Sequence, residues 1–168
     1  YIFSADEVGN MGMDMLCQKA EQNVKVCLIY DSIGSIKTKS KFFKKLTKSG
    51  GKVVPFFPSL FGLKFLNFNI NYRNHRKLVV IDGKLAYIGG INIRDDHMNK
   101  SKKLYPWRDT HLKVYGECVN ELEKIFVNDW NLINESKLVY LKQNCVKAKN
   151  LKTVNIVCSG ANQNKNNI

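Results

Sequence analysis

The chain reads HRKLVVIDGKLAYIGGIN at residues 75–92. The apolar, β-branched run at 78–81 predicts a buried strand. Asp82-Gly83, which follows it, is the strongest two-residue signal for a hairpin turn. The apolar run at 85–88 then predicts the returning strand. This stretch therefore predicts an antiparallel hairpin, around which the rest of the fold can be arranged.

The open end of this hairpin is expected to gather polar and glycine residues. With the turn centred on residues 83–84, His75 falls opposite Asn92 and Lys77 falls opposite Gly90. Residues two apart on a strand share a face, so these four residues are expected to converge. A turn shifted by one residue changes the partners but keeps the cluster.

These residue types suit the handling of a phosphate group. A neutral imidazole can attack phosphorus and form a covalent intermediate, which divides one difficult displacement into two. Lysine offers a compact positive charge to the phosphoryl oxygens, and the asparagine amide adds a donor where charge develops. Gly89 and Gly90 leave room for a phosphate to approach the backbone. We expect such a site to need neither metal nor cofactor; the alternative is a surface hairpin with a solvated basic start.

The spacing His-x-Lys-x4-Asp, followed by Gly-Gly-x-Asn, resembles the HKD motif of the phospholipase D superfamily. The resemblance implies that His75 is the nucleophile and that Lys77 and Asn92 hold the phosphoryl oxygens. Asp82 is grouped with the catalytic set as the third motif residue, although its place at the turn favours a structural role. Enzymes of this superfamily need two such sites, and this chain contains one.

A second segment, WRDTHLKV at residues 107–114, predicts another strand that starts near Asp109. Superfamily members carry an acidic residue on the strand after the motif, where it hydrogen-bonds the nucleophilic histidine, and the resemblance assigns this role to Asp109. A carboxylate on the second ring nitrogen fixes the tautomer and stabilises the imidazolium. The alternative is an ordinary surface aspartate. Strand alternation would put His111 on the face of Asp109, so a supporting role for His111 stays open.

The sequence around the motif is similar to that of bacterial cardiolipin synthases. The similar segments are YIFS (1–4), LIYDSIGS (28–35), NYRNHRK (71–77), YIGGINI (87–93), WRDTH (107–111) and NDW (128–130). The resemblance implies that two phosphatidylglycerols are joined, with release of glycerol, through a phosphatidyl-histidine. Arg73, Asn74, Gly89 and Gly90 are then expected to bind substrate. Two alternatives remain open: a single-motif phosphodiesterase or nuclease acting as a homodimer, and a catalytically silent basic domain that binds anionic membrane.

The domain organisation is expected to be that of one half of a larger enzyme. Residues 1–150 are interpreted as the first phospholipase D-like catalytic half. Residues 151–168 are interpreted as a linker and the truncated start of the second half, because TVNIVCSG at 153–160 resembles that half's first strand. The partner would be that second half or another copy of the chain. The alternative is a complete small protein with a disordered tail.

The charge indicates an anionic partner. The chain has 27 Lys and Arg against 14 Asp and Glu, a net charge of +13, so nucleic acid and anionic membrane are both candidates. No nucleic-acid-binding fingerprint is present, which favours phosphatidylglycerol and a membrane surface over nucleic acid. No apolar run reaches the roughly 18 residues of a membrane span. We expect the protein at the cytoplasmic side of a bacterial cell membrane, where its five scattered cysteines stay reduced and bind no zinc.

Alternating strand and helix patterns predict an α/β fold, and the resemblance implies a mixed β-sheet sandwiched between helices. Helices are predicted at residues 12–22, 39–48 and 117–132, and further strands at 24–30 and 52–57. The polar connector at 99–103 is expected to be a solvated loop rather than a flap. The aromatic-rich segment 56–68 is predicted either to form an apolar lip that enters the bilayer or to pack under the sheet.

Overall fold

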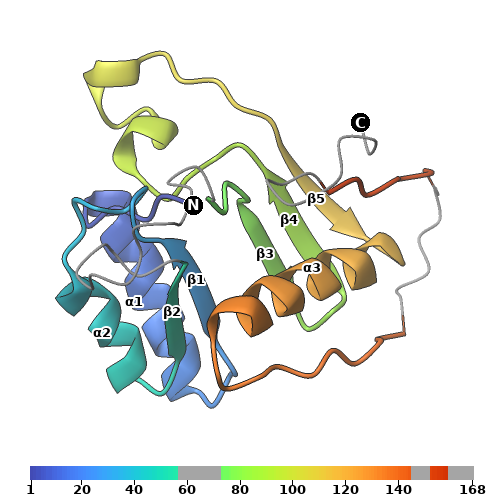
Figure 1. The fold of residues 1–168 in the computed structure, drawn as a ribbon. Helices are drawn as coiled ribbons and strands as arrows, with labels where there is room; N and C mark the ends of the chain where they lie inside the picture. The colour runs from blue at the N-terminus through green and yellow to red at the C-terminus, as the bar shows by residue number, and fades with distance from the viewer. Residues whose placement is uncertain (57–72, 145–151, 159–168) are drawn as a thin grey trace, which may run out of the picture. The chain divides into compact units, whose positions relative to one another are not determined.

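The structure is a computed structural model that describes residues 1–56, 73–144 and 152–158 (Figure 1). The chain divides into two compact units, and each is described by itself. Unit 1 contains described residues 1–56, 74–77 and 90–110, and unit 2 contains residues 73, 78–89, 111–144 and 152–158.

Unit 1 places two helices beside a pair of parallel strands (Figure 1). Its elements are α1 (Glu7–Glu21), β1 (Cys27–Asp31), α2 (Ser40–Lys48), β2 (Lys52–Phe56) and the 3-10 helices η1 (Asp95–Met98) and η2 (Lys102–Leu104). The β1–β2 register runs from Cys27 opposite Lys52 to Asp31 opposite Phe56. Parallel strands need a crossover connection, and α2 provides it.

The core of unit 1 is aromatic. Its buried members are Phe3, Met13, Ala20, Phe42, Phe43 and Leu46. Tyr30 of β1 stacks on Phe43 with ring centroids 3.7 Å apart. The three buried α2 residues recur at helical spacing, as the sequence predicts, so α2 presents one apolar face to the strands and leaves the other to solvent.

Helix α1 begins five residues before the predicted start. Asp6 caps it by accepting a hydrogen bond from the Gly9 N–H at 3.0 Å, and Asp95 accepts a second from the Val8 N–H at 2.8 Å. A side chain at Gly9 would lie 1.7 Å from the Ser4 carbonyl oxygen, so the helix approaches the chain before it closely. The prediction overlooked Asp6 and Glu7, which are ordinary start signals.

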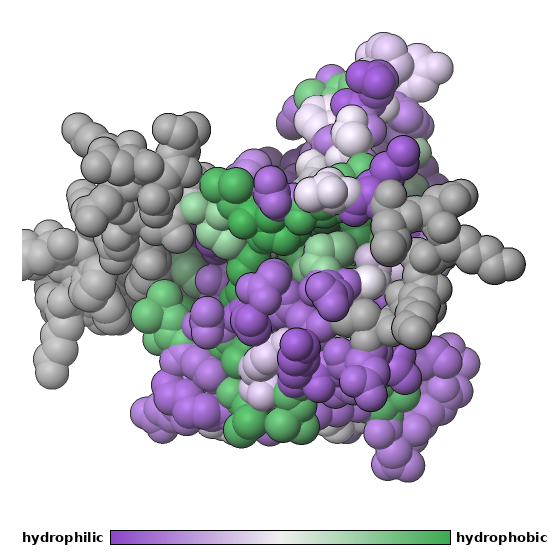
Figure 2. Space-filling model, turned by 90° about the vertical axis from the view of Figure 1, so that its right-hand side faces the viewer, coloured by the Kyte–Doolittle hydropathy of each residue, from purple (hydrophilic) through white to green (hydrophobic). Residues whose placement is uncertain are grey.

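Unit 2 is a three-stranded antiparallel sheet covered on one face by a helix (Figure 1). The strands β3 (Leu78–Ile81), β4 (Leu85–Gly89) and β5 (His111–Tyr115) pair in that order, and α3 (Cys118–Ile133) packs against them. Ala86, Val119 and Leu122 form the buried centre. Hydrophobic side chains also reach the surface among hydrophilic ones, as Figure 2 shows for one face of the molecule.

The predicted hairpin is present, with a turn one residue longer than expected. Asp82 and Gly83 have φ angles of 52° and 62°, and the Lys84 N–H donates to the Ile81 carbonyl at 3.0 Å. Positive φ at both central positions explains the choice of Asp-Gly. Lys84 is an extra residue, because Ile81 pairs with Leu85, and this moves the whole register by one position.

The predicted α/β class is confirmed, with both parallel and antiparallel strands. Among the described residues these strands pair in two sheets, one in each unit. Phe56 is buried at the end of β2, and the rest of the predicted lip, 57–68, lies outside the described residues. The described residues 152–158 form no strand, although Ile156 packs on the core of unit 2. The division at residue 150 stays a prediction.

Candidate active site

The predicted site residues of unit 1 come from two segments, 74–77 and 90–110, with the N-terminal segment lying between them. The Tyr1 nitrogen donates to the Arg76 carbonyl at 3.2 Å. On its other side, the Ile93 N–H donates to the Ile2 carbonyl at 3.2 Å. The predicted pairing of residues 75 and 77 with residues 92 and 90 is therefore wrong, because β3 pairing ends at Leu78 and the N-terminal segment intervenes.

Lys77 and His75 are in direct contact. The Lys77 Nζ lies 3.1 Å from Nδ1 and 3.2 Å from Nε2 of the His75 ring, and it donates to the His75 carbonyl at 2.8 Å. A cation this close to both ring nitrogens disfavours a second positive charge on the ring, so this contact suits a neutral imidazole. His75 is exposed, whereas Lys77 is 9% exposed. The imidazole is thus accessible while its cation is held in place.

The aromatic ring of Tyr1 packs beside His75 and Lys77. Its ring centroid lies 4.4 Å from that of His75, and the Lys77 Nζ lies 4.7 Å from the Tyr1 ring. A cation over an aromatic face is attracted by the ring quadrupole. The Tyr1 carbonyl accepts from the Asp31 N–H at 3.2 Å and from the Ser35 hydroxyl at 3.3 Å, so the end of β1 holds Tyr1 in place.

Burial disfavours the charged form of the Lys77 side chain, and two carboxylates favour it. Burial lowers the pKa of Lys77 from its usual 10.5, and Asp109 and Asp31 raise it in part. Removing a cation from water costs free energy unless anions compensate for it. A bound phosphate would supply further negative charge, so the site is suited to an anionic ligand.

Asn92 is buried and anchors the N-terminal segment. Its Oδ1 accepts the Ile2 N–H at 2.9 Å, and its backbone N–H donates to Nδ1 of His97 at 3.2 Å. An accepting Nδ1 places the proton of a neutral imidazole on Nε2. The Asn92 amide nitrogen lies 3.5 Å from this Nε2, a long contact between two donors. The Asn92 NH2 group therefore keeps donor capacity for a ligand.

His97 is a site residue that sequence reasoning missed. It is 8% exposed, and its ring lies 4.0 Å from that of Trp107, tilted by 34°. Burial lowers the pKa of His97 below 6.5, Arg94 and Lys77 add to this, and Asp109 and Asp96 oppose it. A histidine five residues after Asn92 in an acidic segment gives no sequence signal for this contact.

Asp109 lies against the backbone of Gly90. A methyl group at Gly90 would be 2.0 Å from the Asp109 Oδ1, and the Gly90 N–H donates to the Thr110 carbonyl at 3.1 Å. The Asp109 Oδ1 accepts the Thr110 N–H at 2.8 Å. Strand β5 begins two residues later, so Asp109 precedes the strand on which it was predicted. The structure thus brings Asp109 together with Gly90 and places it within electrostatic reach of Lys77 and His97.

The remaining predicted site residues are Arg73, Asn74, Asp82, Gly89 and His111, and only Asn74 belongs to unit 1. Asn74 is buried, and its Oδ1 accepts the Arg76 N–H at 3.1 Å. Arg73, Gly89 and Asp82 belong to unit 2; Gly89 ends β4 opposite His111, and Asp82 lies in the turn, beyond the four residues of β3. His111 starts β5, and its buried Nδ1 has no hydrogen-bond partner in the described part of the chain. Asp82 thus belongs to unit 2, whereas the histidine and lysine of its motif belong to unit 1.

No cluster of three or more His, Cys, Asp or Glu side chains that could hold a metal occurs in residues 1–56, 73–144 and 152–158. Cys17, Cys27, Cys118 and Cys158 are free thiols.

Comparison with known proteins identifies relatives of this chain. Residues 1–130 match the family described as "Cardiolipin synthase, PLD-like domain". The chain is 51% identical over 131 residues to a cardiolipin synthase of Listeria innocua, which covers 78% of this chain and 27% of that protein. It is 43% identical over 140 residues to one of Oceanobacillus iheyensis, covering 83% and 29%. It is 45% identical over 131 residues to the major cardiolipin synthase of Bacillus subtilis, covering 78% and 27%.

The chain spans between a quarter and a third of the length of these relatives. The family match extends from the N-terminal segment through α3 as far as Trp130, and so includes every residue of the site described above. The chain belongs to the phospholipase D-like domain family of cardiolipin synthases.

Proposed function

We propose that this chain supplies the nucleophilic site of a cardiolipin synthase, which joins two phosphatidylglycerols and releases glycerol. The observation that carries the proposal is the exposed His75 ring held 3.1 Å from the buried Lys77 ammonium, in a chain 51% identical to a cardiolipin synthase.

In the first step, His75 attacks the phosphorus of one phosphatidylglycerol. A nitrogen–phosphorus bond forms, the bond from phosphorus to the glycerol oxygen breaks, and glycerol leaves after taking a proton from a general acid. In the second step, the hydroxyl of another phosphatidylglycerol loses a proton and attacks the same phosphorus. Cardiolipin forms, and the His75 imidazole is released unchanged.

Lys77 and Asn92 are proposed to hold the phosphoryl oxygens. The Lys77 ammonium already lies beside the ring that would attack, so a phosphate arriving at His75 meets the cation without a large movement. The Asn92 NH2 group adds a neutral donor, because its amide oxygen is committed to Ile2. Donors held in place before the charge develops stabilise the transition state most.

Asp109 is proposed to keep His75 and Lys77 in their working charge states. Its carboxylate raises the pKa of Lys77, which favours the ammonium. By the family resemblance it also orients His75, and an imidazolium leaving phosphorus is stabilised by a nearby carboxylate. Asp82, at the turn, is proposed to shape the hairpin.

The general acid and base is proposed to be a histidine outside this chain, on a second catalytic half or a second copy. The acceptor is proposed to be phosphatidylglycerol at the cytoplasmic face of a bacterial membrane. A net charge of +13 favours an anionic lipid surface. None of the helices in the described part of the chain is long and apolar enough to cross a bilayer.

The test is a chimeric Bacillus subtilis synthase in which the matching segment is replaced by residues 1–130 of this chain. It is expressed in cells that lack cardiolipin synthase, beside the same chimera carrying His75→Ala. We expect cardiolipin in the first strain and none in the second, measured by lipid mass spectrometry. A folded chimera that releases phosphatidic acid instead would make the chain a hydrolase. A folded chimera without any lipid product would refute the proposal.

A further inference from the structure

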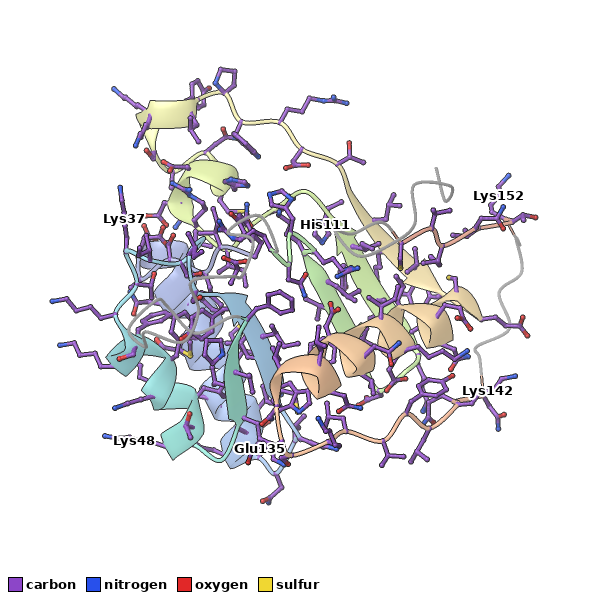
Figure 3. All side chains as sticks on the ribbon, in the orientation of Figure 1. Lys37, Lys48, His111, Glu135, Lys142 and Lys152 are labelled. Atoms are coloured by element: carbon purple, nitrogen blue, oxygen red, sulfur yellow. The ribbon has the colours of Figure 1, made fainter. Side chains whose placement is uncertain are left out.

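Helix α2 carries a dense group of lysines on its solvent face. Lys41, Lys44, Lys45 and Lys48 lie within roughly 100° of the helix circumference, opposite the buried Phe42, Phe43 and Leu46. Lys37 and Lys39 precede the helix, and all six lysines are exposed. Figure 3 shows Lys48 at the lower end of α2 and Lys37 on the loop that precedes the helix. We call these six residues the lysine face.

In the described part of the chain, no carboxylate forms an ion pair with the lysine face. Residues 32–81 contain no Asp or Glu. The Arg94–Asp96, Lys100–Glu7 and Lys124–Glu121 ion pairs all lie outside the lysine face. Like charges at i,i+3 and i,i+4 destabilise a helix, so the lysine face carries an electrostatic cost that an external anionic partner would relieve.

The lysine face is also held firmly. Thr38, just before the helix, donates through its hydroxyl to the Phe3 carbonyl at 2.9 Å. The Phe3 ring lies 5.7 Å from the ring of Phe42 and 6.0 Å from that of Phe43. Because these contacts fix the backbone of α2, the helix loses little backbone freedom when its lysines bind a flat anionic surface.

These contacts link the lysine face to the site. Phe3, against which α2 packs, is two residues from Tyr1, and the Tyr1 ring touches His75. All of these residues belong to unit 1. A surface bound by α2 would therefore be held at a fixed position relative to His75.

An exposed apolar side chain completes the pattern. Ile36, next to Lys37, is 72% exposed. Cations beside an exposed aliphatic group match the boundary between lipid headgroups and acyl chains. A nucleic acid backbone would match the cations but offers no apolar layer to Ile36.

We infer that the lysine face is the surface on which this protein docks on an anionic phospholipid bilayer, with Ile36 entering the headgroup layer. The inference rests on the proposed function for its lipid substrate, and it assigns to α2 the task of holding His75 at the bilayer.

The experiment measures binding of the 168-residue chain to vesicles of phosphatidylglycerol and phosphatidylcholine by sedimentation. The test variant is K41Q/K44Q/K48Q. The matched control is K84Q/K142Q/K152Q, three exposed lysines of unit 2, two of which are labelled in Figure 3. Each variant lowers the net charge by three, from +13 to +10. Circular dichroism and thermal unfolding verify that both stay folded.

We expect the partition coefficient of the test variant to fall roughly 100-fold, because each basic residue at an anionic surface adds about 1 kcal/mol and 1.4 kcal/mol is a factor of ten. The control should stay within about threefold of the unsubstituted chain. Equal losses in both variants, or no loss in the test variant, would overturn the inference. So would a test variant that loses binding to duplex DNA but keeps binding to vesicles.

The proposed function and the proposed docking surface can be refuted independently of each other. Vesicle binding that depends on the lysine face, in a protein whose chimera makes no lipid product, would refute the function and leave the docking surface. A chimera that makes cardiolipin, while K41Q/K44Q/K48Q binds vesicles as the unsubstituted chain does, would refute the docking surface alone.

Discussion

The carboxylate of Asp109 occupies the space in which a side chain at Gly90 would lie. A methyl group there would be 2.0 Å from Oδ1 and 2.5 Å from both the carboxyl carbon and Oδ2. This close approach therefore requires a glycine at position 90. The second glycine of the Gly-Gly-x-Asn pattern leaves room for the Asp109 carboxylate.

Gly90→Ala should destabilise the protein by about 1–3 kcal/mol, the range typical of overpacking. In an Asp109→Ala background the same change should cost less than about 0.5 kcal/mol, because the carboxylate that it strikes is gone. Urea unfolding of the four proteins in this cycle measures the coupling. Equal costs in the two backgrounds would show that Gly90 is needed for another reason.

His97→Phe keeps a ring to pack on Trp107 but removes the acceptor for the Asn92 N–H. A buried donor left without a partner costs about 1–3 kcal/mol, so we expect a loss of that size in the free energy of unfolding. His97→Gln, which retains an acceptor, serves as the comparison and should lose less of the hydrogen-bond contribution. A His97→Phe protein as stable as the unsubstituted one would contradict the assigned contact.

Stability should fall as the pH drops below 6.5. Burial lowers the pKa of His97 from 6.5, so just below that pH the unfolded chain takes up a proton that the folded chain does not. The unfolded state then binds more protons, and the free energy of unfolding decreases with decreasing pH. Urea unfolding at several pH values should show a steeper decrease for the unsubstituted chain than for His97→Phe. Parallel curves would contradict the assignment.

Asp109→Asn should lower the pKa of Lys77 further. The carboxylate is the larger of the two anionic contributions that oppose the effect of burial on this ammonium. Titration of the Lys77 side chain by 13C NMR reports the pKa directly. Asp31→Asn is the matched comparison and should shift it in the same direction by a smaller amount. An unchanged Lys77 pKa in Asp109→Asn would remove the proposed electrostatic role.

The hairpin and two helices could be predicted because their signals are local. The Asp-Gly turn, the β-branched run of β3 and the apolar spacing of α2 and α3 each lie within a short window. The start of α1 is also marked locally, since Asp6 caps the helix, but the predicted helix began only at residue 12. Here the close approach to Ser4 explains a glycine inside a helix.

The roles of the site residues stay predictions, and the structure can be compared only with their predicted placement. Residue types and spacing pointed to His75, Lys77 and Gly90, and the structure brings the first two into contact. The one-residue error in register, the position of Tyr1 beside His75 and the contact of His97 with Asn92 all depend on residues far apart in the chain. Local pattern carries no information on such contacts.

The most direct test of the account is to locate the covalent intermediate. The chimeric synthase is mixed with phosphatidylglycerol, quenched rapidly in denaturant, digested and analysed by mass spectrometry. The account predicts a phosphatidyl group on the peptide that contains His75, assigned to its ring, and its absence in His75→Ala. A phosphatidyl group on a histidine of the other half, or cardiolipin formed by His75→Ala, would contradict the account.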